Sequence, residues 1–423
     1  MAIPVFSITF VVFLAASLAV RIWLARRQIR CVRRHRDDVP AAFSARIDDA
    51  AHRKAADYTI ARVQVEEVEA AVDMLAIFAL TLGGGIAAFA RATGTLAAPP
   101  LIADLALIAA VALVGGAIAL PFSWWRSFRL EARFGFNRTT PKRWLADIAG
   151  AALVTAILGA PLLAAVLWLM SAAGALWWLD AWLVWVAFQV ALAVLYPTLI
   201  APLFNRFTPL PPGALRDRVE RLLARCRFGA ARLFVVDGSR RSSHANAWFA
   251  GLGRAKRVAL FDTLLDQLAP DEVEAVLAHE IGHYRLHHVA KRIAWSAALS
   301  LVVLALFAAV ARAPWFLAGL GIPAAEVPAM IARPGVALIL FVVALPAFTF
   351  VLAPVASAWS RRHEFEADAF AARHASGPAL VAALTRLYAD NASTLTPDPL
   401  YAAFHDSHPP AAERVARIQG VSA

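Results

Sequence analysis

Long apolar stretches alternate with short polar or basic segments along this chain. A helix needs on the order of 20 apolar residues to cross the hydrocarbon layer of a membrane, because each backbone polar group must be hydrogen-bonded within its own segment. The stretches that meet this requirement are residues 4–24, 72–90, 101–124, 148–172, 177–203, 293–311 and 335–359. The pattern therefore predicts a mainly α, polytopic membrane protein with about seven transmembrane helices.

The composition favours a membrane protein over a soluble protein with buried core helices. Of the 423 residues, 60% are hydrophobic and 17% are charged, which is too apolar for an ordinary soluble chain. Tryptophan, whose amphipathic ring prefers the headgroup level, marks the ends of several stretches. These residues are Trp124, Trp125, Trp177, Trp178, Trp315 and Trp359.

Clusters of basic residues predict the orientation. Segments 26–36 and 126–143 are rich in Arg and Lys, so they are expected in the cytoplasm. An odd number of crossings then places the N-terminus outside and the C-terminus, with the polar segment 205–292, inside. The net charge of +11 belongs mainly to membrane-flanking loops without a recognisable binding module, and this excludes nucleic acid as a partner.

The polar segment between the fifth and sixth stretches predicts a cytoplasmic, zincin-like α+β metalloprotease domain. Its pattern indicates an amphipathic helix at 214–227 and short strands at 232–236, 246–250 and 257–261. The chain then divides into transmembrane helices 1 to 5 with their cytoplasmic loops (1–204), the zinc protease domain (205–292), transmembrane helices 6 and 7 (293–359), and a C-terminal cytoplasmic part of the protease domain (360–423).

The chemistry is concentrated in a helix that Pro270 and Asp271 open, since proline and an acid both suit the first helical turn. His279 and His283 are four residues apart, so both imidazoles lie on one helix face and can reach a single zinc ion. Glu280 follows the first ligand and can contact the attacking water as a general base without binding the metal.

A catalytic zinc site usually has three protein ligands and keeps its fourth position for water. Glu364 is predicted as the third ligand, in the run Ser360-Arg-Arg-His-Glu364-Phe-Glu366-Ala-Asp368. Asp368 lies one turn later and is expected to accept the outward N–H of a ligand histidine. Glu366 is expected to point elsewhere. The alternatives are a helix with ordinary solvated charges, or a ligand among His287, His288 and His363.

Several segments resemble the type I CAAX prenyl endopeptidases, and the resemblance covers nearly the whole chain. The motifs that carry it are His279-Glu-Ile-Gly-His283, the Glu364 to Asp368 spacing, Arg240-Arg-Ser-Ser-His-Ala-Asn246-Ala-Trp, His408-Pro-Pro-Ala-Ala-Glu413-Arg414, Arg53-Lys-Ala-Ala-Asp-Tyr58, Thr81-Leu-Gly-Gly-Gly85 and Arg133-Phe-Gly-Phe-Asn-Arg-Thr-Thr-Pro141. The resemblance implies transmembrane helices around a water-filled chamber, which the zinc domain closes at its cytoplasmic end.

The same resemblance implies that Asn246 and His408 line the catalytic cleft, where either could orient the peptide or donate to the developing oxyanion. Arg414 could pair with Glu413, with Asp368 or with a substrate carboxylate. Asp104 and Asp180 could face the chamber or lie at the membrane interface.

Together these features predict a membrane-embedded metalloendopeptidase with one zinc ion per chain, in contact with lipid. Its substrate is a peptide or protein, prenylated or membrane-associated, so the activity is CAAX-type processing or membrane protein quality control. The Arg-, Ala- and Trp-rich composition favours a bacterial inner membrane. The alternative is a non-proteolytic chamber or transporter whose structural zinc has a fourth protein ligand.

Overall fold

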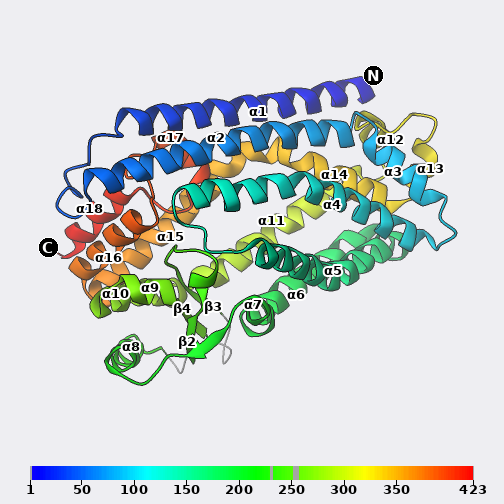
Figure 1. Cartoon of the computed structure of the whole chain (residues 1–423). Coiled ribbons are helices and arrows are strands. Elements are labelled where there is room, and N and C mark those ends of the chain that lie inside the picture. The colour runs from blue at the N-terminus through cyan, green and yellow to red at the C-terminus, as the bar shows by residue number, and fades with distance from the viewer. Residues whose placement is uncertain (1, 229–231, 251–256, 423) are drawn as a thin grey trace.

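Long helices lying side by side along the molecule form most of the structure (Figure 1). The computed structural model describes residues 2–228, 232–250 and 257–422. The N-terminus lies at one end of the helical bundle, and the C-terminus lies at the other end, where a small sheet and several shorter helices gather.

Among the described residues, six helical segments are long and apolar enough to cross a membrane. They contain α1 (Ala2–Arg34), α4 (Pro100–Trp125), α5 (Pro141–Ala172), α6 (Trp177–Leu195), α11 (His288–Val310), and the pair α14 (Pro334–Thr349) and α15 (Ala353–His374). The other predicted span consists of α2 (Asp49–Leu80) and α3 (Gly85–Gly94), which qualify together. The predicted polytopic helical fold is confirmed.

The second span differs from the continuous helix predicted at 72–90, because α2 and α3 meet at a bend of 50°. Gly84 lies at the bend with φ of +78°, a left-handed conformation that only glycine adopts freely. A Cβ on Gly83 would lie 2.6 Å from the carbonyl oxygen of Ala79. The glycine run therefore breaks the helix inside an apolar stretch.

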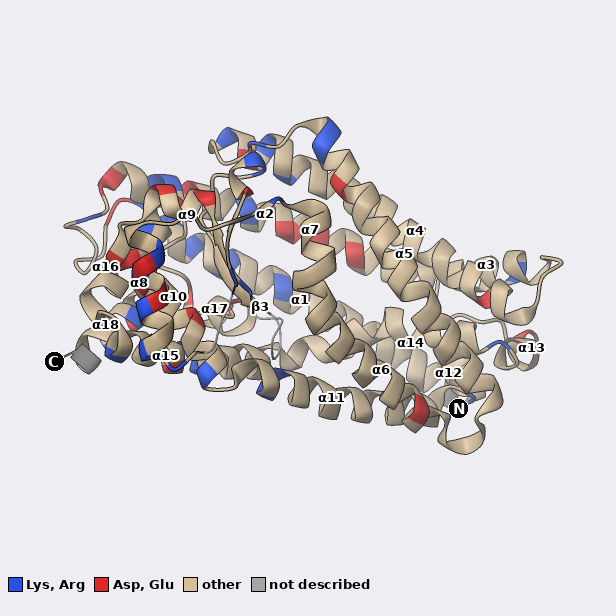
Figure 2. Ribbon diagram, turned by 90° about the horizontal axis from the view of Figure 1, so that it is seen from below, with Lys and Arg blue, Asp and Glu red and all other residues tan. Residues whose placement is uncertain are grey.

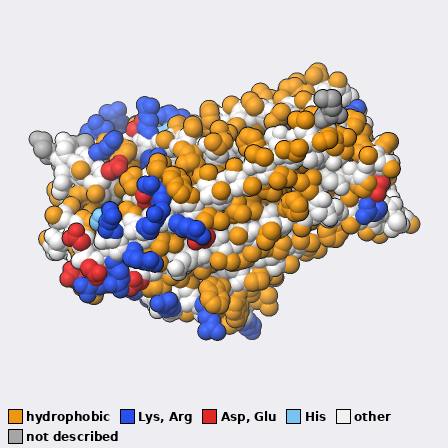
Figure 3. All heavy atoms as spheres, turned by 90° about the horizontal axis from the view of Figure 1, so that it is seen from above, with side chains coloured by type: hydrophobic (Ala, Val, Ile, Leu, Met, Phe, Trp, Pro, Cys, Tyr) orange, Lys and Arg blue, Asp and Glu red, His pale blue; other side chains and the backbone are white. Residues whose placement is uncertain are grey.

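The surface of the bundle is apolar between two charged ends. Lys, Arg, Asp and Glu gather around α8, α10, α15, α16 and α18, whereas α5, α6 and α11 carry few charges along their length (Figure 2). The space-filling view has the same apolar band over the bundle (Figure 3). Leu113 in α4 is 74% exposed, which is unfavourable in water and favourable against lipid tails. The molecule is an integral membrane protein.

The charged end contains a four-stranded sheet whose order is β1 (Phe207–Pro209), β2 (Arg232–Val236), β4 (Arg257–Phe261) and β3 (Ala247–Ala250). β2 and β4 are parallel, and the two outer pairs are antiparallel. The three predicted strands are present, and β1 is an additional one. β3 lies at an edge of the sheet. The amphipathic helix α8 (Ala214–Arg225) buries Val219, Leu222 and Leu223.

Two helices far apart in sequence pack closely and carry most of the candidate site: α10 (Pro270–Arg285) and α15. Gly282 allows this approach, since a Cβ there would lie 3.2 Å from the Cα of Ala367 and 3.1 Å from the Cβ of Phe370. α16 (Gly377–Asp390), α17 (Pro399–His405) and α18 (Ala411–Ser422) complete this end of the molecule. The shared core includes Leu277, Ile281, Phe370, Leu380 and Ile418.

Asp104 in α4 is buried in an ion pair and does not face an open chamber. Its carboxylate accepts hydrogen bonds from the Nε of Arg333 at 2.9 Å and from the N–H of Gly335 at 2.8 Å. The Nη2 of Arg333 also donates to Thr93 at 3.1 Å. Protein groups compensate the charge, so Asp104 ties α3, α4 and α14 together. Asp180, by contrast, is exposed.

Candidate active site

The helix α10 begins as its sequence predicts. Pro270 is its first residue, and the side chain of Glu272 accepts a hydrogen bond from the N–H of Ala269 at 2.8 Å. The carboxylates of Asp271 and Glu272 lie at the positive end of the helix dipole, where negative charge is favourable. The helix is buried over most of its length, which fixes the direction in which His279 and His283 point.

His279, His283 and Glu364 converge on one point. The two Nε2 atoms are 3.2 Å apart, Glu364 Oε2 lies 3.5 Å from His279 Nε2, and Glu364 Oε1 lies 3.3 Å from His283 Nε2. Ligands about 2.1 Å from a tetrahedral zinc ion are about 3.4 Å from one another. The three residues therefore fit a divalent cation, and they are the predicted ligands.

A buried ion pair supports the first ligand. His279 Nδ1 lies 2.8 Å from Asp368, and Arg414 holds the same carboxylate with two hydrogen bonds of 2.6 and 2.8 Å. Of the three partners considered for Arg414, the structure therefore places Asp368 against it. Burial disfavours a charged imidazole, but the hydrogen bonds to Asp368 and Glu364 outweigh burial and raise the pKa of His279 to about 9. The site thus attracts positive charge.

Glu280 directly follows His279 in α10 and is partly buried, whereas His279 and Ile281 on either side of it are buried. Burial of the carboxyl raises its pKa, although the positive potential of His279 and His283 opposes this effect. A raised pKa brings a carboxyl nearer to neutrality, which suits a group that must both accept and return a proton.

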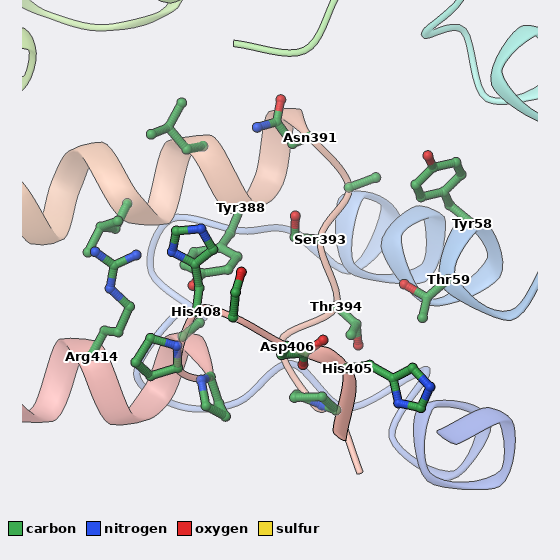
Figure 4. A pocket seen from close by; sticks show the side chains of 18 of the residues that line it. Tyr58, Thr59, Tyr388, Asn391, Ser393, Thr394, His405, Asp406, His408 and Arg414 are labelled. Atoms are coloured by element: carbon green, nitrogen blue, oxygen red, sulfur yellow. The ribbon is translucent and has the colours of Figure 1, made fainter. Parts of the chain in front are cut away.

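A cavity of about 610 Å³ is lined in part by His408, which contacts Glu364. His408 Nδ1 lies 2.7 Å from Glu364 Oε2, and its side chain is 63% exposed. Residues of α2, of the segment after α16 and of the segment before α18 line the cavity, including Tyr58, Asn391 and Asp406 (Figure 4). His408 thus lies between Glu364 and this cavity.

Asn246 immediately precedes the edge strand β3, and its side chain is exposed. Its carbonyl oxygen accepts a hydrogen bond from the N–H of Phe261 at 3.1 Å. This contact fixes the backbone of Asn246 at the edge of the sheet and leaves the amide available to a bound peptide.

Two further residues lie close to the ligands: His288, one of the alternative ligands considered from the sequence, and Glu366. His288 Nδ1 lies 2.9 Å from the Nδ1 of His283, and His288 Nε2 lies 3.1 Å from Glu366. Glu366 therefore does not face the three converging ligands, as expected, but it contacts the site indirectly through His288. The spacing of Glu366 from Glu364 indicates a different helix face, and only the position of His288 across the helix interface brings it into contact.

A second network joins the sheet domain to the membrane helices. His244 lies 3.2 Å from Glu131 and 3.2 Å from the side-chain oxygen of Asn391. Tyr58 in α2 donates a hydrogen bond to the same Glu131. These contacts hold the segment before β3 against α2 and against residues 126–131, the helical turns that follow α4.

A buried His-His-Glu cluster with an adjacent glutamate, on a bundle of membrane helices, defines the class of integral-membrane metallopeptidases. Comparison with known proteins agrees with this class. Residues 28–206 match the family described as "CAAX prenyl protease N-terminal, five membrane helices", and residues 209–422 match peptidase family M48. The chain therefore belongs to peptidase family M48, and this excludes the non-proteolytic alternative.

Individual relatives cover most of the chain. A CAAX prenyl protease 1 homolog from Oryza sativa subsp. japonica is 35% identical over 75% of this chain and 74% of its own length. CAAX prenyl protease 1 from Saccharomyces cerevisiae is 34% identical over 72% of this chain and 69% of its own. The crystal structure of S. mikatae Ste24p covers 98% of both chains with a TM-score of 0.88 and 28% identity.

Proposed function

We propose that this protein is a zinc endopeptidase that cleaves near the C-terminus of CAAX-type substrates. The convergence of His279, His283 and Glu364 at 3.2 to 3.5 Å carries the proposal, because three protein ligands are the set that a catalytic zinc ion uses while keeping its fourth position for water. The names of the relatives support the choice of substrate. The orientation proposed places the catalytic end in the cytoplasm of a bacterial cell, since the basic segment 26–36 belongs to this end.

The residues of the site divide the chemistry between them. When bound to the three ligands, zinc supplies the Lewis acid that polarises the scissile carbonyl and acidifies the attacking water. Glu280 accepts the proton of that water and later delivers it to the leaving amine. In this proposal His408 and Asn246 donate hydrogen bonds to the substrate, and Arg414 and Asp368 hold His279 in its ligand orientation.

The edge strand β3 is the proposed binding site for the substrate backbone. The carbonyl of Asn246 accepts a hydrogen bond from the N–H of Phe261, so the backbone groups of Asn246 face β4. Backbone direction alternates along a strand, so the N–H and C=O groups of Ala247 and Phe249 point away from β4, toward the open edge. An extended peptide can pair with these groups by β-augmentation. Such pairing holds the scissile bond near the metal with little demand on side chains.

Replacing Ala247 with Pro removes one backbone N–H from the exposed edge without breaking a bond to β4. The expected result is a rise in KM of roughly 3- to 10-fold, the value of one hydrogen bond of 0.5 to 1.5 kcal/mol. Proline is tolerated at sheet edges, so zinc content should be unchanged. Steady-state kinetics of A247P and of the control A247S, which keeps the N–H, test this. Equal KM values in both variants would place the substrate elsewhere.

The substrate proposal is tested with two peptides of one CAAX sequence, prenylated and unprenylated, and detergent-purified protein. Preferential cleavage of the prenylated peptide is the expected result. Equal cleavage of both would favour quality control of unmodified polypeptides by the same site. Cleavage of neither by a zinc-loaded sample would contradict the CAAX proposal.

A further inference from the structure

Beside the three proposed ligands, His288 and Glu366 form a row that begins at His283 and extends away from Glu364. His288 is only 1% exposed and lies between the Nδ1 of His283, 2.9 Å away, and Glu366, 3.1 Å away. Glu366 also accepts a hydrogen bond of 3.0 Å from the Nε of Arg362. The metal-binding geometry described above does not require any of these three outer residues.

The turn between α10 and α11 places His288. His287 has φ of +58°, a left-handed conformation that ends α10 after its C-terminal turn and redirects the chain. His288 is the first residue of α11, which then enters the membrane. His288 thus belongs to a membrane helix and contacts His283 on α10.

The metal site at one end and the Glu366 carboxylate at the other determine which group donates in each hydrogen bond of the row His283, His288 and Glu366. The Nε2 of His283 faces His279 and Glu364, so it must be free of a proton when it binds a metal. The proton of His283 is then on Nδ1 and is donated to His288 Nδ1. A neutral His288 that accepts there carries its own proton on Nε2, which faces the Glu366 carboxylate. Each donor in this row meets an acceptor.

The same residues are poorly arranged as a second metal site, although His288, His363 and Glu366 offer ligand atoms within 4.8 Å of one another. The rings of His288 and His363 are stacked, with centroids 4.0 Å apart and planes inclined by 8°. Imidazole lone pairs lie in the ring plane, so two stacked rings cannot both direct a lone pair at one ion. The Nδ1 of His288 is also occupied by His283.

We propose that His288 and Glu366 are positioning residues, which hold His283 in its metal-binding tautomer and ring orientation through the relay His283–His288–Glu366. The inference rests on the proposed zinc site. It gives the second ligand the kind of support that Asp368 and Arg414 give the first, through one additional imidazole. Glu366 is more exposed than Asp368, so removal of its carboxylate should cost less than removal of the His288 acceptor.

The test measures zinc affinity, by competition with a chelating dye, in full-length detergent-purified variants. H288F keeps a ring of similar size but lacks the acceptor, and we expect zinc affinity to fall about 10- to 100-fold. H288N returns an acceptor near the Nδ1 position and should recover part of the loss. E366A should weaken binding less than H288F, and E366Q, which keeps an acceptor oxygen, less than E366A. The control H363F keeps the stacked ring and removes only its nitrogens, so it should bind zinc as the native chain does.

The outcomes separate the relay from the proposed function. Unchanged zinc affinity in H288F would overturn the relay while leaving the zinc site intact. Two zinc ions in the native chain and one in H363F would overturn it in favour of a second metal site. A native chain that retains no zinc would overturn the proposed function, and the relay with it. Thermal melting of the metal-free variants distinguishes a lost acceptor from a misfolded protein, and recovery in H288N supports the relay even if H288F folds poorly.

Discussion

Replacing Glu280 with Gln should lower kcat by about 10²- to 10⁴-fold, the usual contribution of a general base, while the protein keeps its zinc. Gln has nearly the same volume as Glu and leaves His279, His283 and Glu364 in place, but its amide cannot accept the proton of the attacking water. Fluorogenic peptide cleavage and metal analysis on the same detergent-purified samples measure both quantities.

A matched control is available on the same helix. Glu274 lies in α10 six residues before Glu280, and its carboxylate pairs with Arg218 and Arg225 on α8, away from the ligands. E274Q should reduce thermal stability and leave kcat near the native value at a temperature well below unfolding. Native kcat in E280Q would remove Glu280 from the mechanism, and equal losses in both variants would point to a general effect of altered charge on α10.

Hydropathy predicted the membrane part of the fold because a helix that spans the hydrocarbon layer needs about 20 consecutive apolar residues, and a run of this length is visible in the sequence. The same averaging hides local breaks. The bend between α2 and α3 depends on three consecutive glycines, which a window over 72–90 reads as apolar or neutral. Strand β1 is only three residues long and ends in Pro209, so it is shorter than the five-residue runs that predicted β2 and β4.

The proposed metal ligands could be predicted for a different reason. The positions of His279 and His283 follow from helix periodicity alone, and Glu364 and Asp368 share a second helix face in the same way. What the sequence does not contain is the relation between the two helices, which depends on close packing at Gly282 and Ala367. Two contacts depend on this packing. The pairing of Arg414 with Asp368 could therefore be predicted only as one of three alternatives, and the contact of His288 with Glu366 was not predicted.

Replacing Glu364 with Ala should lower zinc affinity at least about 100-fold, since loss of an outer hydrogen-bond partner alone typically costs 10- to 100-fold. Two neutral imidazoles would remain to bind a divalent cation. The buried guanidinium of Arg414, 3.9 Å from Glu364, would also lose one of the two carboxylates that face it. Chelator competition measures the affinity, and activity should fall with zinc occupancy. E364Q, which keeps an oxygen ligand without the charge, should lie between E364A and the native chain.

His408 provides the sharpest check on this assignment. Its Nδ1 is 2.7 Å from Glu364, so it is close enough to replace the lost carboxylate as a ligand. If E364A keeps native zinc affinity, the double variant E364A/H408A distinguishes two explanations. Loss of zinc only in the double variant would assign His408 as a substitute ligand. Retention in both would show that Glu364 is not a ligand, because two histidines alone would then account for binding.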